Sequence, residues 1–285
     1  MFPITGAATR LDCGNSSPLP RQASRDRGGR TATRPLTGIG GLRRMTGSEA
    51  RPRLARWSAG FSPEASEVVV TDREAQQLRL AMVESQIARR GVRDQRVLEA
   101  MRFVPRHEFV PPDQAPYAYE DRALAVGEEQ TISQPYIVGY MTELLRVAPE
   151  HRVLEIGTGT GYQTAVLSRL AHKVYTVERL EGLAATARER LTAMGYGNVE
   201  YRVGDGTLGW PEAAPFDRIL VTAAAPSTVE PLVDQLREGG RLVVPVGGPE
   251  GQHVTVVERR GGRLVTETLI AVRFVKLIGA AGFPG

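Results

Sequence analysis

The second half of the chain alternates short runs of β-branched and aliphatic residues with stretches of helical spacing. Runs typical of strands lie at 153–156, 174–177, 199–203, 218–222 and 241–246. Helical spacing over about 162–170 and 183–194 separates the first three runs. This alternation predicts an α/β fold with a parallel, doubly wound sheet. The late runs 253–258 and 264–275 have no helix between them, so we expect antiparallel pairing at the C-terminal edge.

The residues before these strands predict N-terminal helices. Thr71 or Asp72 can cap a helix over 74–90 that ends at Gly91, and its buried side carries Leu78, Met82 and Ile87. Asp94 can cap a short helix over 97–101, and four prolines predict mostly loop over 103–130. A further helix begins with Pro135 in its first turn and has an apolar face formed by Ile137, Met141, Leu144 and Leu145.

The first 70 residues have a different composition, rich in Arg, Gly and Pro, and we expect them to form a disordered extension. Residues 1–60 carry eleven arginines and three acids, a net charge of +8, without apolar periodicity. The extension could be a transit peptide, or translation could start later, at Met45 or Met82. The whole chain has a net charge of +4, so the remainder sums to 4 − 8 = −4, and we expect no nucleic-acid partner.

Other bulk features narrow the class of protein. The single cysteine, Cys13, excludes a disulfide framework and a cysteine-rich zinc site, and we expect no metal. This cysteine usage fits a reducing, cytoplasmic setting. No apolar run is long enough to cross a bilayer, so we expect no membrane partner. We expect one globular domain over residues 71–280, and a monomer.

The turn after the first predicted strand is rich in glycine. Gly157, Gly159 and Gly161 follow the run 153–156 at GxGxG spacing, where an open α/β sheet forms its ligand crevice. Glu178 ends the next strand and could accept hydrogen bonds from both ribose hydroxyls of an adenosine ligand. Each feature alone also fits an ordinary turn or a surface acid, but their combination favours a nucleoside site.

Two further segments carry candidate site residues. Asp205 and Gly206 follow the third strand, where the carboxylate could bind an adenine amino group, although Asp-Gly is also a common turn. Ser133 lies in the unusual segment 130–136 (QTISQPY), two residues before Pro135. On spacing alone, the Ser133 hydroxyl could simply cap the helix that follows.

Several of these segments together resemble the protein-L-isoaspartate O-methyltransferase family. The resemblance rests on QTISQPY at 130–136, VLEIGTGTGYQ at 153–163, Asp205-Gly206, APFDRILVTAAAP at 214–226 and LREGGRLVVPVG at 236–247. The segment 89–109 also resembles the N-terminal helices of that family, and the likeness extends over about 76–278. A GxGxG turn occurs in many methyltransferases, whereas the TISxP segment is much more specific.

The resemblance implies a Rossmann-like fold of the S-adenosylmethionine-dependent methyltransferase type. It implies methyl transfer from S-adenosyl-L-methionine to the α-carboxyl group of L-isoaspartyl residues in damaged proteins and peptides. It assigns Ser133 to the active site and places Gln130, Thr131, Ile132 and Ser133 near the donor. It assigns donor binding to the glycine turn 157–161, Glu178, Asp205 and Gly206.

The implied chemistry fits the residues present. A carboxylate with a pKa near ~4 is ionised at neutral pH, so the reaction needs no general base, and we assign no catalytic role to the four histidines. The chain departs from the family at Glu129, where glycine is usual, and at Lys276, where proline is usual. Two alternatives remain: a methyltransferase for another carboxyl or small-molecule acceptor, and a non-catalytic binding module with the nucleoside fold.

Overall fold

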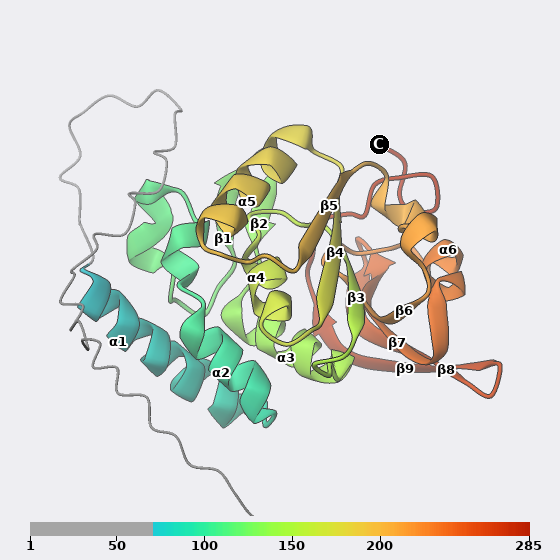
Figure 1. Ribbon diagram of the computed structural model, residues 1–285, viewed down its shortest axis with the longest axis horizontal. Coiled ribbons are helices and arrows are strands. Elements are labelled where there is room, and N and C mark those ends of the chain that lie inside the picture. The colour runs from blue at the N-terminus through green and yellow to red at the C-terminus, as the bar shows by residue number, and fades with distance from the viewer. Residues whose placement is uncertain (1–70) are drawn as a thin grey trace, which may run out of the picture. The chain divides into compact units, whose positions relative to one another are not determined.

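The computed structural model describes residues 71–285, which belong to one compact unit (Figure 1). The predicted extension at 1–70 lies outside the described residues and stays a prediction. Seven strands form the main sheet in the order β5-β4-β3-β6-β7-β8-β9. They are β3 (Arg152–Ile156), β4 (Lys173–Glu178), β5 (Val199–Val203), β6 (Phe216–Val221), β7 (Leu236–Gly248), β8 (Gly251–Arg260) and β9 (Arg263–Val272).

Strand pairing confirms the predicted topology. The pairs β3–β4, β3–β6, β4–β5 and β6–β7 are parallel. The pairs β7–β8 and β8–β9 are antiparallel, as the missing helices between the late runs indicated. The sheet is therefore Rossmann-like, with a partly antiparallel C-terminal edge. The order reverses at β3, so the crevice that binds ligands in such sheets lies at the carboxyl ends of β3 and its neighbours.

Buried side chains alternate between the two faces of the sheet. Val153 on β3 belongs to one apolar cluster and Leu154 to the other. The Val153 face is covered by α3 (Pro135–Leu145), α4 (Tyr162–Ser168) and α5 (Glu181–Ala193), as Figure 1 shows. The Leu154 face is covered by α6 (Glu230–Asp234) and nearby loops. Burial on both faces explains why the central strands β3, β4 and β6 are mostly apolar, whereas the edge strand β5, with the sequence VEYRV, is only partly buried.

The N-terminal helices pack beside α3 and extend the first apolar cluster. Thr71 caps α1 (Asp72–Met82) through a capping box with Glu74, and Asp94 caps α2 (Gln95–Phe103), so both predicted caps are confirmed. The first helix is not α-helical to its end, because a π-helical turn, Val83–Ile87, and a 3-10 turn, Ala88–Arg90, complete it. Leu78 was wrongly predicted to be buried, as it is 45% exposed.

The segment 103–130 is more ordered than the prolines predicted. It contains 3-10 helices at Arg106–Phe109 and Pro112–Tyr117 and the strand β1 (Leu124–Gly127). Strand β1 pairs with β2 (Gln130–Ile132) in a separate antiparallel hairpin. Its turn residues Glu128 and Glu129 both have positive φ, 50° and 57°, as a type I′ turn requires. This hairpin leads directly into α3 and so places the segment around Ser133 against the sheet.

Candidate active site

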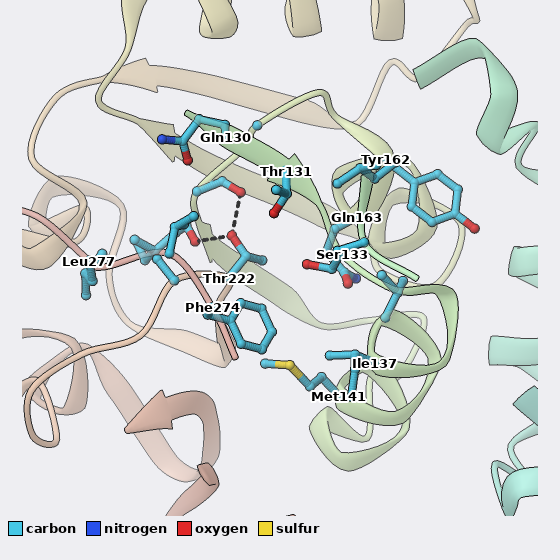
Figure 2. A pocket seen from close by; sticks show the side chains of 18 of the residues that line it. Gln130, Thr131, Ser133, Ile137, Met141, Tyr162, Gln163, Thr222, Phe274 and Leu277 are labelled. Carbon is cyan, nitrogen blue, oxygen red and sulfur yellow. Dashed lines mark hydrogen bonds between the residues drawn. The ribbon is translucent and has the colours of Figure 1, made fainter. Parts of the chain in front are cut away.

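A cavity of about 450 Å³ lies at the carboxyl ends of the parallel strands, between the main sheet and the segment from β2 to α3 (Figure 2). The lining residues come from the segment 121–123 before β1, the β2–α3 segment, the loops after β3, β4, β5 and β6, and the chain after β9. Of the predicted site residues, the cavity brings together Gln130, Thr131, Ile132, Ser133, Gly157, Gly159, Glu178 and Gly206. Among the described residues that line it there is no histidine.

The glycine turn after β3 presents bare backbone to the cavity. Gly157 has φ +94°, and a Cβ there would lie 2.3 Å from Thr222 Oγ1. The Thr222 hydroxyl donates to the carbonyl oxygens of Ile156 (2.9 Å) and Gly157 (2.8 Å), the bonds dashed in Figure 2. Gly159 has φ +54°, and a Cβ there would meet nothing within 4 Å. The close approach of Thr222 thus requires glycine at position 157, whereas the space next to Gly159 is open beside the cavity.

Glu178 connects the end of β4 to the glycine turn. Its Oε2 accepts the Gly159 amide at 2.9 Å, and its Oε1 accepts the amides of Arg179 (2.9 Å) and Leu180 (3.1 Å). A carboxylate has about four acceptor positions, two on each oxygen. Three are filled here, so Oε2 keeps one position for a ligand hydroxyl. The side chain is 7% exposed and lines the cavity.

The buried side chain of Glu155 is connected to the glycine turn through threonine hydroxyls. Glu155 is fully buried, and its Oε2 accepts the hydroxyls of Thr164 (2.5 Å) and Thr176 (2.7 Å). The Thr176 hydroxyl also lies 2.7 Å from that of Thr158 in the turn. Burial raises the pKa of Glu155 to about 8, although the hydrogen bonds from Thr164 and Thr176 act to lower it. This chain of side chains links the turn to the strands beneath it.

Two predicted donor-binding residues do not line the cavity. Gly161 faces α5 instead, because a Cβ there would lie 3.0 Å from Leu191 Cδ1. The Asp205 carboxylate accepts the amide and hydroxyl of Thr207 and the amide of Ala280. Gly206 does line the cavity, and a Cβ there would lie 2.5 Å from Ile156 Cγ2. The two glycines therefore allow close packing, and Asp205 binds other parts of the chain.

Ser133 lines the cavity, and its hydroxyl does not cap the helix that follows. Helix α3 begins at Pro135, and its N-cap residue is Gln134, without a side-chain cap hydrogen bond. The alternative that Ser133 caps this helix is therefore wrong. Within residues 71–285 the Ser133 hydroxyl has no hydrogen-bond partner, whereas the neighbouring Gln134 side chain binds Asp121. Ser133 and Gln163 both line the cavity, and in Figure 2 Ser133 lies on the other side of Thr222 from Leu277.

Sequence reasoning missed several residues that line the cavity. Ile137 and Met141 were assigned only to the apolar face of a helix, yet both line the cavity, as does Phe274 after β9. Thr222 directly follows the buried strand β6, and this position at the carboxyl end of a parallel strand could have identified it as a site residue. Nothing in the sequence around Phe274 and Leu277 predicts that they line the cavity, because they lie far along the chain from the other lining residues and meet them only in the folded protein.

Over residues 71–285, no helix has the length and apolar character to cross a membrane. The same part of the chain contains no group of three or more His, Cys, Asp or Glu side chains that could hold a metal ion.

Comparison with known sequences points to one enzyme family. The family model for protein-L-isoaspartate(D-aspartate) O-methyltransferase matches residues 77–282. A protein-L-isoaspartate O-methyltransferase from Methanoregula boonei is 58% identical over 205 residues, which cover 72% of this chain and 94% of that protein. A protein-L-isoaspartate O-methyltransferase 2 from Pelobacter propionicus is 55% identical over 204 residues, 71% of this chain and 91% of that protein.

Comparison with solved structures agrees. A structure of a protein-L-isoaspartate O-methyltransferase shares 32% identity with a TM-score of 0.63, covering 73% of this chain and 66% of that chain. A protein-L-isoaspartate O-methyltransferase from Plasmodium falciparum, solved in complex with S-adenosyl-L-homocysteine, shares 24% identity with a TM-score of 0.62. That match covers 70% of this chain and 98% of the other, and it shows similarity of fold.

Proposed function

Since the chain belongs to the protein-L-isoaspartate(D-aspartate) O-methyltransferase family, we propose that the cavity carries out that family's reaction, with Ser133 at the acceptor. The chain transfers a methyl group from S-adenosyl-L-methionine to the α-carboxyl group of L-isoaspartyl residues in damaged proteins and peptides. Which residues hold the donor and the acceptor is the proposal, and the geometry of the cavity supports it.

The residues around the glycine turn fit an adenosyl donor. When bound, S-adenosylmethionine supplies a methyl group on a positively charged sulfonium sulfur. The side-chain-free position at Gly159 opens beside the cavity, and the remaining acceptor position of Glu178 Oε2 can take one ribose hydroxyl. Accepting both ribose hydroxyls, as we expected from the sequence, would require Glu178 to release one of its three backbone amides.

The unpartnered Ser133 hydroxyl is the observation that carries the proposal for the acceptor. A polar group that faces a cavity without a partner is available to a ligand. The isoaspartyl α-carboxylate, with a pKa near ~4, is already ionised and loses no proton in the reaction. A neutral hydroxyl can donate a hydrogen bond to this carboxylate and hold it in line for attack. Ser133 therefore orients the nucleophile and does not activate it.

The apolar side of the cavity keeps water away from that carboxylate. Ile137 and Met141 from α3 and Phe274 after β9 line the space near Ser133 (Figure 2). A carboxylate that exchanges its water shell for one hydroxyl and an apolar wall becomes a stronger nucleophile. Charge also decreases as the methyl group moves to an anion, so a dry site favours the step. The nitrogen of the next backbone amide then attacks the ester carbonyl carbon, and the methoxy group leaves as methanol with the amide proton. The resulting succinimide hydrolyses partly to aspartate without an enzyme group.

Paired peptides test the acceptor, and variants test Ser133. With labelled donor, the protein should methylate an isoaspartyl peptide and not the aspartyl peptide of the same sequence. Equal labelling of both peptides would refute the acceptor assignment. Ser133→Ala should lower turnover of the isoaspartyl peptide by about 10–10³-fold without loss of stability. Ser85→Ala is the matched control, because that hydroxyl binds the Ala81 carbonyl on an N-terminal helix and lies outside the cavity. Equal turnover of both variants would remove Ser133 from the reaction.

We also propose that the protein acts as a monomer in the cytoplasm, on protein substrates and without nucleic acid. Light scattering coupled to size-exclusion chromatography should give a mass near 31.0 kDa, and a mass near twice that value would contradict the monomer.

A further inference from the structure

The chain after β9 returns to the carboxyl edge of the sheet and closes one end of the cavity. The Ala224 amide donates to Val275 O (2.8 Å), and the Leu277 amide donates to Ala224 O (2.7 Å). Leu277 is 5% exposed, and both Leu277 and Ile278 line the cavity. In Figure 2, Leu277 and Ser133 lie on opposite sides of Thr222. Gly206, beside the candidate donor-binding turn, lines this same cavity.

Residues 277–283 form a closed loop, which we call the C-terminal loop. The Gly279 amide donates to Phe283 O (3.1 Å), and the Phe283 amide donates to Leu277 O (2.8 Å). These bonds lie within the loop and do not attach it to the sheet. Its attachment at residues 280 and 281 comes from two side chains on the segment after β5.

Asp205 and Thr207 make that attachment. Asp205 Oδ2 accepts the Ala280 amide at 2.7 Å, and Thr207 Oγ1 accepts the Ala281 amide at 3.0 Å. The Thr207 hydroxyl itself donates to Asp205 Oδ1 at 2.6 Å, so the two side chains act as one unit. A Cβ at Gly279 would lie 2.0 Å from Asp205 Oδ1, which shows how closely the loop backbone approaches the carboxylate.

The protonation of Asp205 agrees with this arrangement. Partial burial raises the pKa of Asp205, but hydrogen bonds from the Ala280 amide and from the hydroxyl and amide of Thr207 outweigh it. The pKa therefore lies below its usual value, and the carboxylate is charged at neutral pH. Charge-assisted hydrogen bonds to backbone amides are about twice as strong as neutral ones.

We propose that Asp205 and Thr207 are positioning residues that hold the C-terminal loop against the end of the cavity where Leu277 and Ile278 form the wall. Asp205 then affects donor affinity through the loop, not through a hydrogen bond of its own to the donor. The inference rests on the proposed function for the identity of the ligand. The attachment of the loop is a property of the protein without ligand, so it can be tested separately.

Amide hydrogen exchange on the ligand-free, full-length chain tests the attachment. Asp205→Ala should accelerate exchange at Ala280 and Ala281 by about 10–100-fold, because one bond is lost and the Thr207 hydroxyl loses its acceptor. Asp234→Ala is the control, since Asp234 is exposed on α6 and does not line the cavity. Unchanged exchange at both amides in Asp205→Ala would overturn the proposal.

A double-mutant cycle on S-adenosylhomocysteine binding, measured by calorimetry, distinguishes indirect from direct action. Ala280→Pro removes the amide that Asp205 accepts and leaves the carboxylate in place. If Asp205 acts through the loop, Asp205→Ala and Ala280→Pro should each weaken binding by about tenfold, and the double variant by no more than either. Losses that multiply would show that Asp205 reaches the ligand itself and would overturn the proposal.

The two experiments separate this inference from the proposed function. Wild-type protein that binds no S-adenosylhomocysteine would defeat the proposed donor site, while the exchange experiment would still decide whether Asp205 holds the loop. Conversely, wild-type protein that methylates isoaspartyl peptide normally, together with multiplying losses in the cycle, would defeat only the positioning role.

Discussion

Alanine at Gly159 and at Gly161 should separate ligand binding from folding within one five-residue turn. At Gly159, alanine would adopt φ +54°, inside the left-handed region, which costs about 1–2 kcal/mol of stability. Its methyl group would meet no protein atom within 4 Å and would occupy space beside the cavity. Gly159→Ala should therefore fold with a modest loss and weaken S-adenosylhomocysteine binding by about 10–100-fold, the range of an overpacked contact of about 1–3 kcal/mol.

Gly161→Ala is the matched control and should show the reverse pattern. Its φ of +90° is less favourable for alanine, and its methyl group would lie 3.0 Å from Leu191 Cδ1 and 3.5 Å from Ala187 Cβ. Backbone strain and overpacking together should cost about 2–4 kcal/mol of unfolding free energy. Denaturant unfolding gives the stability of each variant, and calorimetry gives the affinity of the folded protein. Wild-type affinity in Gly159→Ala, or wild-type stability in Gly161→Ala, would refute this assignment of the two glycines.

Three further substitutions test other parts of the site. Glu129→Gly should raise the unfolding free energy by up to about 1 kcal/mol in denaturant titrations, because Glu129 has φ +57° in the β1–β2 turn. Glu178→Ala should weaken S-adenosylhomocysteine binding by ~1–3 kcal/mol in calorimetry, and unchanged affinity would remove Glu178 from the donor site. Glu155→Gln should become more stable relative to wild type as pH rises from 4.5 to 8, by about 1.4 kcal/mol per pH unit. The folded pKa of Glu155 is raised to about 8, so wild type alone loses stability across that window, and a difference that does not vary with pH would contradict this sign.

The parts of the fold that the sequence predicted are those that local patterns determine. Thr71 and Asp94 cap helices because each side chain meets a backbone amide two or three residues away. The parallel strands were recognisable because burial on both faces requires nearly continuous apolar runs. The glycine turn and Glu178 were placed together because both follow parallel strands that end at one edge of the sheet.

The parts that were missed depend on distant residues or on unusual turn chemistry. The β1–β2 hairpin was predicted as loop, because its turn residues are Glu128 and Glu129 rather than the Asn or Gly that signal such turns. Leu78 occupies an apolar position by spacing, but in the described part of the chain it stays 45% exposed. Asp205 accepts a hydrogen bond from the amide of Ala280, which lies 75 residues later, and no local sequence pattern predicts this bond.

Residues of one motif therefore differ in what they do, and the neighbouring atoms decide which residue contacts a ligand. Gly159 and Gly161 have the same side chain two positions apart, yet one borders open space and the other packs on Leu191. Glu178 ends one strand and Asp205 follows another at the same sheet edge, yet Glu178 lines the cavity and accepts the Gly159 amide, while Asp205 accepts the Ala280 amide of the C-terminal loop. A change at a contact residue should weaken ligand binding to the folded protein by more than its loss of stability explains. A change at a supporting residue should alter local opening or stability first and affinity only as a consequence. Measuring both quantities on each variant assigns every residue of the motif to one class.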